Sequence, residues 1–248
     1  MDWFSIRTIS RYVVMLNFAC VFYGDKYLKP PTAPWSYVKN LYNMVERNLT
    51  VPHRFICFTD NTVIHKRKEF KNTNIEFRPF KRHDFEGWFN KLQLFSPQSE
   101  LKGNTLYMDL DVVIMKNIDC FTTIGEDKNF VGMNDFNPTS GLFNSSIMRF
   151  NNKYHSKLIW EDYMKRRSEF SRYTGDQEII SNIIKKHDDT ISFPDEWTQS
   201  YKWLNRDGKR YHITKMTYEQ DPNAKVCVFH GNPNPHESTQ KWVQELWK

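Results

Sequence analysis

The chain has 248 residues, of which 39% are hydrophobic and 16% aromatic, and its formal net charge is +6. This length fits one domain with a sizeable core, or two small ones, and aromatic rings must fill much of the interior. Only nine residues are glycine, and no two lie closer than seven positions apart. That spacing excludes the glycine motifs of dinucleotide-binding proteins, of P-loop proteins and of the hydrolase nucleophile elbow. The basic balance suits anionic partners such as phosphates, nucleic acid or acidic glycans.

The cysteine spacing and the first apolar run indicate where such a protein would work. The four cysteines form no CxxC pair, which excludes a zinc knuckle and favours reduced, buried thiols. The run 13–22 is too short to cross a bilayer and lacks a good cleavage site, so we expect a core strand and no transmembrane segment. Residues 1–11 would be an N-terminal extension. Few alanines and many asparagines and lysines suggest an AT-rich genome, so we predict the cytoplasm of a bacterium or of a phage-infected host.

Hydrophobic patterning predicts alternating strands and helices in the first half of the chain. There we expect strands over 13–22, 54–59, 75–77 and 106–115, and helices over 35–48 and 88–94. The second half is more mixed, with strands over 130–133, 141–150 and 226–230 and helices over 157–167 and 176–186. This alternation predicts a single α/β domain with a mostly parallel sheet flanked by helices. Its two halves would span about 12–120 and about 121–248.

Two acids stand in the most strongly apolar of these strands, Leu106–Ile114. On one continuous strand Asp109 and Asp111 would share a face, roughly 7 Å apart. Like charges at that spacing repel unless a cation joins them, and a divalent ion at the carboxyl end of a parallel strand would do so. Oxygen ligands suit Mg²⁺ or Mn²⁺. The alternative is a solvent-facing pair, and the apolar flanks argue against it.

The same stretch resembles the DxD motif of GT-A-fold glycosyltransferases, particularly family 8 and its bacterial and phage relatives. The resemblance implies a GT-A-like, Rossmann-like fold in which Asp109, Leu110 and Asp111 contact the diphosphate of a nucleotide sugar, with a metal ion between them. The segment 228–236 resembles the family's closing segment, which implies that His230 is the third metal ligand and Gly231 a donor contact. An imidazole ligand favours Mn²⁺ over Mg²⁺. A satisfied histidine at a strand end is the alternative.

Further segments resemble the family in the same order along the chain. Asn234 stands where the family has a lysine that contacts the diphosphate, and the helix 87–95 makes Lys91 the candidate for that contact. A surface lysine on an amphipathic helix is the alternative. Base and ribose contacts are expected after the first two strands, where the alternative for the tyrosines is plain packing. These donor candidates are Tyr23, Gly24, Tyr27 and Asp60.

The resemblance implies that the half 12–120 binds the nucleotide and that the half 121–248 binds the donor sugar and the acceptor. This second half contributes three more candidates. The turn 174–178 resembles the Gly-Asp-Gln turn of the family, which implies that Asp176 and Gln177 hold sugar hydroxyls near the reacting carbon. Asp176 as a helix cap is the alternative. If the enzyme inverts the anomeric configuration, Asp135 or Asp176 would be the general base. An aromatic cluster suits sugar rings or the core, and we expect the core for Trp197, Tyr201 and Trp203.

The sequence therefore predicts a metal-dependent glycosyltransferase that uses a nucleotide sugar, with UDP favoured and retention implied by the resemblance. The acceptor would be a glycan, a small sugar or modified DNA. Two other classes stay open. One is a non-catalytic nucleic-acid- or glycan-binding protein on the same fold. The other is a metal-dependent nucleotidyltransferase or nuclease, which would be expected to carry further acids where this chain has a histidine. The oligomeric state is left open.

Overall fold

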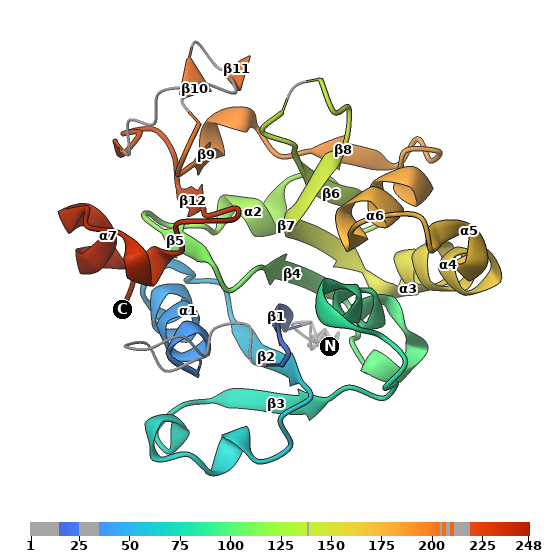
Figure 1. Cartoon of the computed structure of the whole chain (residues 1–248), viewed down its shortest axis with the longest axis horizontal. Helices are drawn as coiled ribbons and strands as arrows, with labels where there is room; N and C mark the ends of the chain where they lie inside the picture. The colour runs from blue at the N-terminus through green and yellow to red at the C-terminus, as the bar shows by residue number, and fades with distance from the viewer. Residues whose placement is uncertain (1–14, 25–34, 138, 204, 207–208, 211–218) are drawn as a thin grey trace, which may run out of the picture.

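The computed structural model describes residues 15–24, 35–137, 139–203, 205–206, 209–210 and 219–248. Its centre is a seven-stranded sheet in the order β3-β2-β1-β4-β7-β6-β8 (Figure 1). The strands are β1 (Leu16–Phe22), β2 (His53–Thr59), β3 (Ile75–Pro79), β4 (Asn104–Met108), β6 (Phe130–Asn134), β7 (Phe143–Asn151) and β8 (Thr190–Ser192). Only β7 runs against the others in this sheet, because it pairs in antiparallel fashion with both β4 and β6. The prediction of a mostly parallel sheet in an α/β fold is confirmed.

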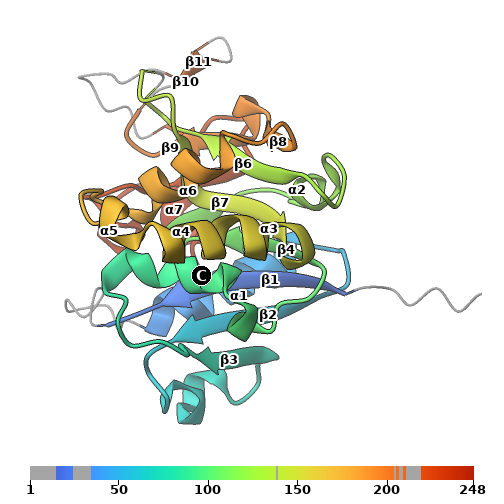
Figure 2. The same ribbon diagram turned by 90° about the vertical axis from the view of Figure 1, so that its right-hand side faces the viewer.

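Helices cover both faces of this sheet (Figure 2). Successive residues of β1 alternate between two cores: Phe18 packs with α1 (Trp35–Asn48), and Ala19 packs with η3 (Gly87–Phe95) and α6 (Asp176–Ile184). The predicted helix 35–48 is confirmed to the residue, and the helix predicted over 88–94 is a 3₁₀-helix. The remaining helical segments are η1 (Ile64–Lys66), η2 (Lys68–Phe70), η4 (Pro97–Ser99), α2 (Cys120–Thr123), α3 (Asn152–His155), η5 (Ser156–Glu161), α4 (Asp162–Lys165), α5 (Arg167–Phe170), η6 (Asp195–Trp197), η7 (Pro235–Glu237) and α7 (Lys241–Leu246).

A second, three-stranded sheet corrects one prediction. Its order is β5 (Val112–Ile114), β12 (Val226–Val228) and β9 (Thr198–Ser200), and a two-stranded ribbon joins β10 (Asn205–Arg206) to β11 (Lys209–Arg210). The predicted strand 106–115 is therefore two strands that belong to different sheets. The carboxyl end of β4 pairs with β7, whereas β5 pairs with β12.

The two acids consequently lie in the connection between β4 and β5. The amide of Asp109 makes a last bond to Ser146 O (2.9 Å), and the large sheet ends there. The predicted geometry, with Asp109 and Asp111 on one face of one strand, is wrong. A turn at this point keeps both carboxylates out of the sheet interior, where unpaired charge is strongly unfavourable.

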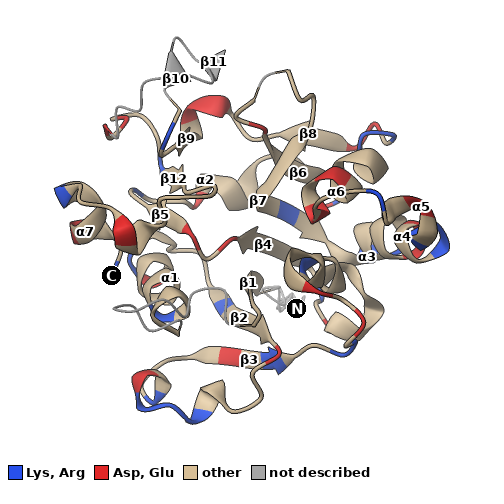
Figure 3. Ribbon diagram, in the orientation of Figure 1, with Lys and Arg blue, Asp and Glu red and all other residues tan. Residues whose placement is uncertain are grey.

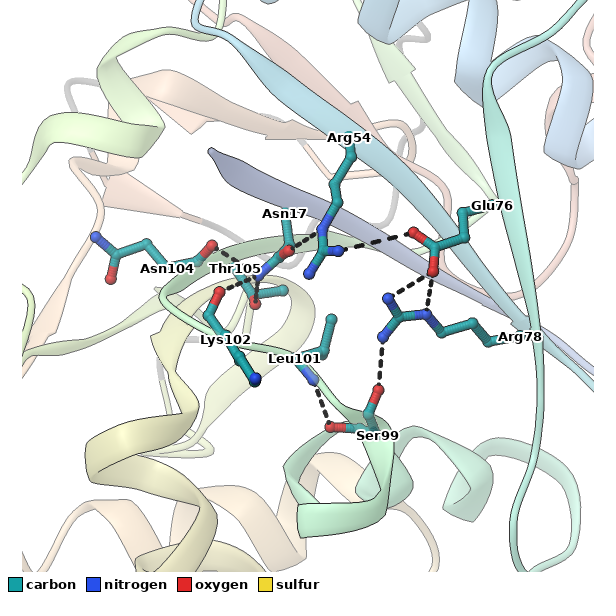
Figure 4. A network of polar contacts seen from close by, with 9 residues as sticks. All are labelled: Asn17, Arg54, Glu76, Arg78, Ser99, Leu101, Lys102, Asn104 and Thr105. Carbon is teal, nitrogen blue, oxygen red and sulfur yellow. Dashed lines mark hydrogen bonds and ion pairs between the residues drawn. The ribbon is translucent and has the colours of Figure 1, made fainter. Parts of the chain in front are cut away.

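The opposite end of the sheet is closed by a polar network (Figure 4). Asn17 on β1 is fully buried, and its amide nitrogen donates to the carbonyl oxygens of Lys102 (2.9 Å) and Asn104 (3.2 Å). Arg54 on β2 donates from Nε to Asn17 Oδ1 (2.6 Å) and lies 3.9 Å from Glu76 on β3. These bonds tie the starts of β1, β2 and β4 together, so that their carboxyl ends meet at one edge.

Two smaller observations complete the fold. No helix among the described residues combines the length and the apolar character needed to cross a bilayer. Cys20, Cys57 and Cys227 are buried free thiols, as expected from their apolar surroundings.

Candidate functional site

A cavity of about 220 Å³ opens where β1 and β4 end and where β7 and α6 begin. Figure 3 shows acidic residues between β4 and β5 and on α6, the segments that border this region. Ligands bind at the carboxyl ends of strands in sheets of this kind. Seven of the predicted site residues line the cavity: Tyr23, Lys91, Asp109, Leu110, Asp176, Gln177 and His230.

A buried ion cluster forms the wall of the cavity. Lys91 comes from η3, and its Nζ atom lies 2.9 Å from Asp176 Oδ2 and 3.0 Å from Asp109 Oδ1. Burial alone would lower the pKa of Lys91, but the charges of the two carboxylates outweigh it and raise that pKa above its ordinary value. Lys91 is therefore charged, and the alternative of a surface lysine is wrong.

Hydroxyl groups complete the cluster. Tyr107 on β4 donates to Asp109 Oδ1 (2.5 Å), and Ser145 on β7 donates to Asp176 Oδ2 (2.7 Å). Burial first, and then the charge of Asp109, raises the pKa of the Tyr107 hydroxyl, which keeps it a donor. Asp176 is the first residue of α6, while the cap position is Gly175. The carboxylate of Asp176 thus faces Lys91, and the alternative of a helix cap is wrong.

His230 and Asp111 both lie at the end of the small sheet where β12 ends and β5 begins. The amide of Phe229 donates to Asp111 O (3.0 Å), so the connection between β4 and β5 runs beside the end of β12. The imidazole of His230 stacks on Phe136 with ring centroids 5.2 Å apart, and its Nε2 atom lies 2.6 Å from Ser200 Oγ.

Two carboxylates and an imidazole are a donor set that suits Mn²⁺. The chemistry of Asp109, Asp111 and His230 fits such an ion. Within the described ranges no three His, Cys, Asp or Glu side chains form a cluster that could hold a metal ion. Asp109 is also bonded to Lys91 and Tyr107. The metal triad stays a prediction.

The remaining candidate residues are not among those that line the cavity. Gly24 has a positive φ of 55°, and its amide donates to Asp60 Oδ2 (2.8 Å), so the ends of β1 and β2 are joined. Asp135 follows β6 and is half-buried, with its amide bonded to Leu142 O, and it does not line the cavity. Gly231 follows His230 with a φ of 73°. Tyr27 lies outside the described residues.

The position of the expected phosphate-binding lysine has a local structural role. Asn234 caps η7, because its backbone and side-chain nitrogens both donate to Glu237 Oε2 (2.7 and 3.1 Å). Another cation stands nearby: Lys202 Nζ donates to His230 O (2.7 Å). Burial lowers the pKa of Lys202, and no described carboxylate forms an ion pair with it. The sequence did not reveal this lysine, since it follows β9, far from the His-Gly motif.

Other contributors to the cavity were also missed. Ser145 and Trp88 line it, although the sequence shows only a strand residue and a helix residue at these positions. The signal that identifies them is proximity to Asp176 and Gly175, which only the folded chain provides. The expectation for the aromatic cluster is confirmed, since Tyr201 is buried and Trp197 and Trp203 pack against the core.

Comparisons with known proteins place the fold. No protein-family model and no curated protein sequence matches this chain. Among solved structures it is similar to an active-site mutant of LgtC, with a TM-score of 0.62, 13% identity and 93% of each chain covered. It is also similar to the galactosyltransferase LgtC in complex with donor and acceptor sugar analogs, with a TM-score of 0.58, 13% identity and the same coverage.

A further similar structure is the apo form of the glycosyltransferase GlyE of Streptococcus pneumoniae TIGR4, with a TM-score of 0.61 and 11% identity. The match covers 94% of this chain and 59% of GlyE. At such identities the likeness establishes the fold and no more. The predicted GT-A-like fold class is confirmed.

Proposed function

We propose that this protein is a glycosyltransferase that moves a sugar from a nucleotide-sugar donor, with a UDP-sugar favoured, to an acceptor with retention of configuration. The observation that carries the proposal is the buried cluster in which Lys91 joins Asp109 to Asp176 at the wall of a strand-end cavity. Asp109, from the connection after β4, and Asp176, from the start of α6, both line this cavity. LgtC, which shares the fold, was solved with donor and acceptor sugar analogs.

The net negative charge of the site means that binding a diphosphate would require additional cations. Lys91 carries one positive charge between two carboxylates, so the cluster has a net charge of −1 and would repel a diphosphate. A divalent ion held by Asp109, Asp111 and His230 would supply Lewis-acid stabilisation of the leaving diphosphate. Lys202, beside His230, would add a positive charge from the chain itself.

The remaining residues have roles in binding and orientation. Asp176 and Gln177 would hold hydroxyls of the donor sugar, and Lys91 would keep the Asp176 carboxylate oriented. A phosphate contact from Lys91 itself stays a prediction, as do base and ribose contacts from Tyr23, Gly24, Tyr27 and Asp60. Asp135 or Asp176 would serve as the general base if the reaction inverts configuration.

The first experiment measures hydrolysis of UDP-glucose with Mn²⁺ by the wild-type chain and by Asp111→Asn. We expect turnover that a chelator removes and that the variant loses, while its circular dichroism spectrum is unchanged. No turnover with any UDP-, GDP- or TDP-linked sugar would contradict the proposal, and nucleotide-sugar binding without turnover would identify a non-catalytic binding protein. Release of pyrophosphate from a nucleoside triphosphate would instead identify a nucleotidyltransferase.

The acceptor class is tested separately by mass spectrometry across glycans, small sugars and phage DNA bases. Binding to a DNA acceptor would weaken steeply with salt, because phosphate contacts release counterions. Binding to a neutral glycan would show little salt dependence.

A further inference from the structure

One apolar side chain at the cavity is left in contact with solvent. Trp88 is 48% exposed, and in the part of the chain that the structure describes only Met15, Val63 and Tyr154 are other exposed large hydrophobic residues. Of these four, Trp88 alone lines the candidate site. Tryptophan is enriched at binding interfaces, because its ring offers a large apolar face and its N–H group a polar contact.

The indole is held in place before any ligand arrives. Trp88 Nε1 donates to Thr174 O (2.9 Å), and its Nε1 edge faces Gly175, where an added Cβ atom would lie 3.5 Å away. Thr174 is itself fixed, because its amide donates to Glu178 Oε2 (2.7 Å) across the first turn of α6. A side chain that is already ordered loses little conformational entropy on binding.

Its position separates it from the buried part of the site. Lys91 and Asp176 line the same cavity with side chains that are each 7% exposed, whereas Trp88 is 48% exposed. The expected base and ribose contacts belong to other segments, where Gly24 bonds to Asp60 after β1 and β2.

We propose that Trp88 is the platform on which the sugar ring of the acceptor stacks. This inference rests on the proposed function. The apolar C–H face of a pyranose packs on an aromatic ring, and hydroxyls at the ring edge reach polar groups beside it. A half-exposed indole that lines the same cavity as the polar side chain of Gln177 provides both kinds of contact. The acceptor would therefore present a pyranose, which makes a glycan or a small sugar the favoured class over an unglycosylated DNA base.

The test uses the full chain labelled with 5-fluorotryptophan and observed by ¹⁹F NMR. Trp88→Phe removes one resonance and so assigns it. Methyl β-galactopyranoside, methyl α-glucopyranoside and methyl β-xylopyranoside are then titrated in the presence of UDP, with the open-chain polyol sorbitol as the control ligand. We expect a saturable shift of the Trp88 resonance with at least one glycoside and none with sorbitol.

Variants give a second readout. Trp88→Ala should weaken glycoside binding about tenfold, a change of ~1.4 kcal/mol, and Trp88→Phe should weaken it less, while the Kd of UDP stays unchanged in both. The matched control is Tyr154→Ala, an exposed aromatic residue outside this cavity, which should change neither Kd.

The platform is refuted if every glycoside leaves the Trp88 resonance unmoved, or if UDP alone accounts for its shift. Failure of the proposed function is a different result: no nucleotide binds and no nucleotide sugar is turned over, whatever the glycosides do to Trp88.

Discussion

Lys91 and Asp176 form a buried ion pair, with Nζ 2.9 Å from Oδ2, although one lies in η3 and the other begins α6. Asp109 joins the pair from the end of β4, so three distant segments depend on one ammonium group. A buried carboxylate without its cation is far more unfavourable than an exposed one. The cluster is therefore a stability element as well as a part of the candidate site.

Replacement of this lysine should weaken the whole fold. Lys91→Met leaves Asp109 and Asp176 without their partner, and we expect the free energy of unfolding in urea to fall by about 3–5 kcal/mol. The matched control is Lys128→Met, which removes an exposed pair with Asp189 (3.2 Å) and should leave stability unchanged. Equal stability of the wild-type and Lys91→Met chains would show that the cluster contributes nothing.

Lys202 should act on phosphates and not on the nucleoside. Lys202→Met is expected to weaken UDP binding about tenfold, because a cation beside His230 is lost, and to leave uridine binding unchanged. Calorimetry at low and high salt provides the measurement, and the difference should shrink at high salt. Lys241→Met, at a side chain 88% exposed, is the control. A parallel loss of uridine affinity would mean that Lys202 only supports the turn at 230–231.

His155 should make stability depend on pH away from the site. Burial is the main cause that lowers the pKa of His155 to about 4, and its Nδ1 atom lies 3.0 Å from both the backbone nitrogen and the backbone oxygen of Asn151. An unfolded histidine titrates near 6.5, so between pH 6.5 and 4 the unfolded chain binds a proton that the folded chain does not. The free energy of unfolding should therefore fall by about 3 kcal/mol as the pH drops through that window.

His155→Gln should flatten this dependence, and the exposed His187→Gln should retain it. Urea titrations at several pH values measure the slopes. Identical slopes for the wild-type and His155→Gln chains would assign the pH dependence to other groups.

The polar network around Asn17, at the end of the sheet opposite the cavity, should affect the stability of the fold and not the affinity for UDP. Asn17→Ala removes the donor to two backbone carbonyls and the acceptor of Arg54 Nε, and we expect a loss of about 2 kcal/mol in the free energy of unfolding. Glu76→Gln alters only the more exposed end of the network and should change stability by less than ~0.5 kcal/mol. Because the network lies opposite the cavity, UDP affinity should be equal in both variants. A change in UDP affinity would reveal coupling through β1.

Most helices and strands could be predicted from local hydrophobic patterns. The wrong prediction over 106–115 arose because strand pairing depends on residues far apart in the chain. The helical spacing of Val38, Leu41 and Val45 identified α1, since each faces the same core. The run 106–115 could not be divided from the sequence, because β4 and β5 are both apolar and both buried. Only their partners, Ile147 on β7 and Val228 on β12, separate them into two sheets.

For the site as well, residues in short motifs could be predicted, whereas residues brought in by the fold could not. Asp109 and Asp176 could be found because each belongs to a short motif, and the fold brings both to Lys91. The sequence assigned Lys91 to a diphosphate, whereas the folded chain gives it two carboxylate partners. No role in the site was predicted for Trp88 or Lys202. Their surroundings come from residues far along the chain, which spacing cannot report.

The pairing of the small sheet has a consequence for the order in which the chain folds. β12 is the middle strand, so β5 and β9 share no hydrogen bonds with each other and are joined only through residues 226–228. Such distant pairing is slow to form. The connection that carries Asp109 and Asp111 is therefore closed along this edge only when residues 226–229 have folded against it. A chain truncated before residue 226 is expected to leave β5 without its partner strand and this connection without its support.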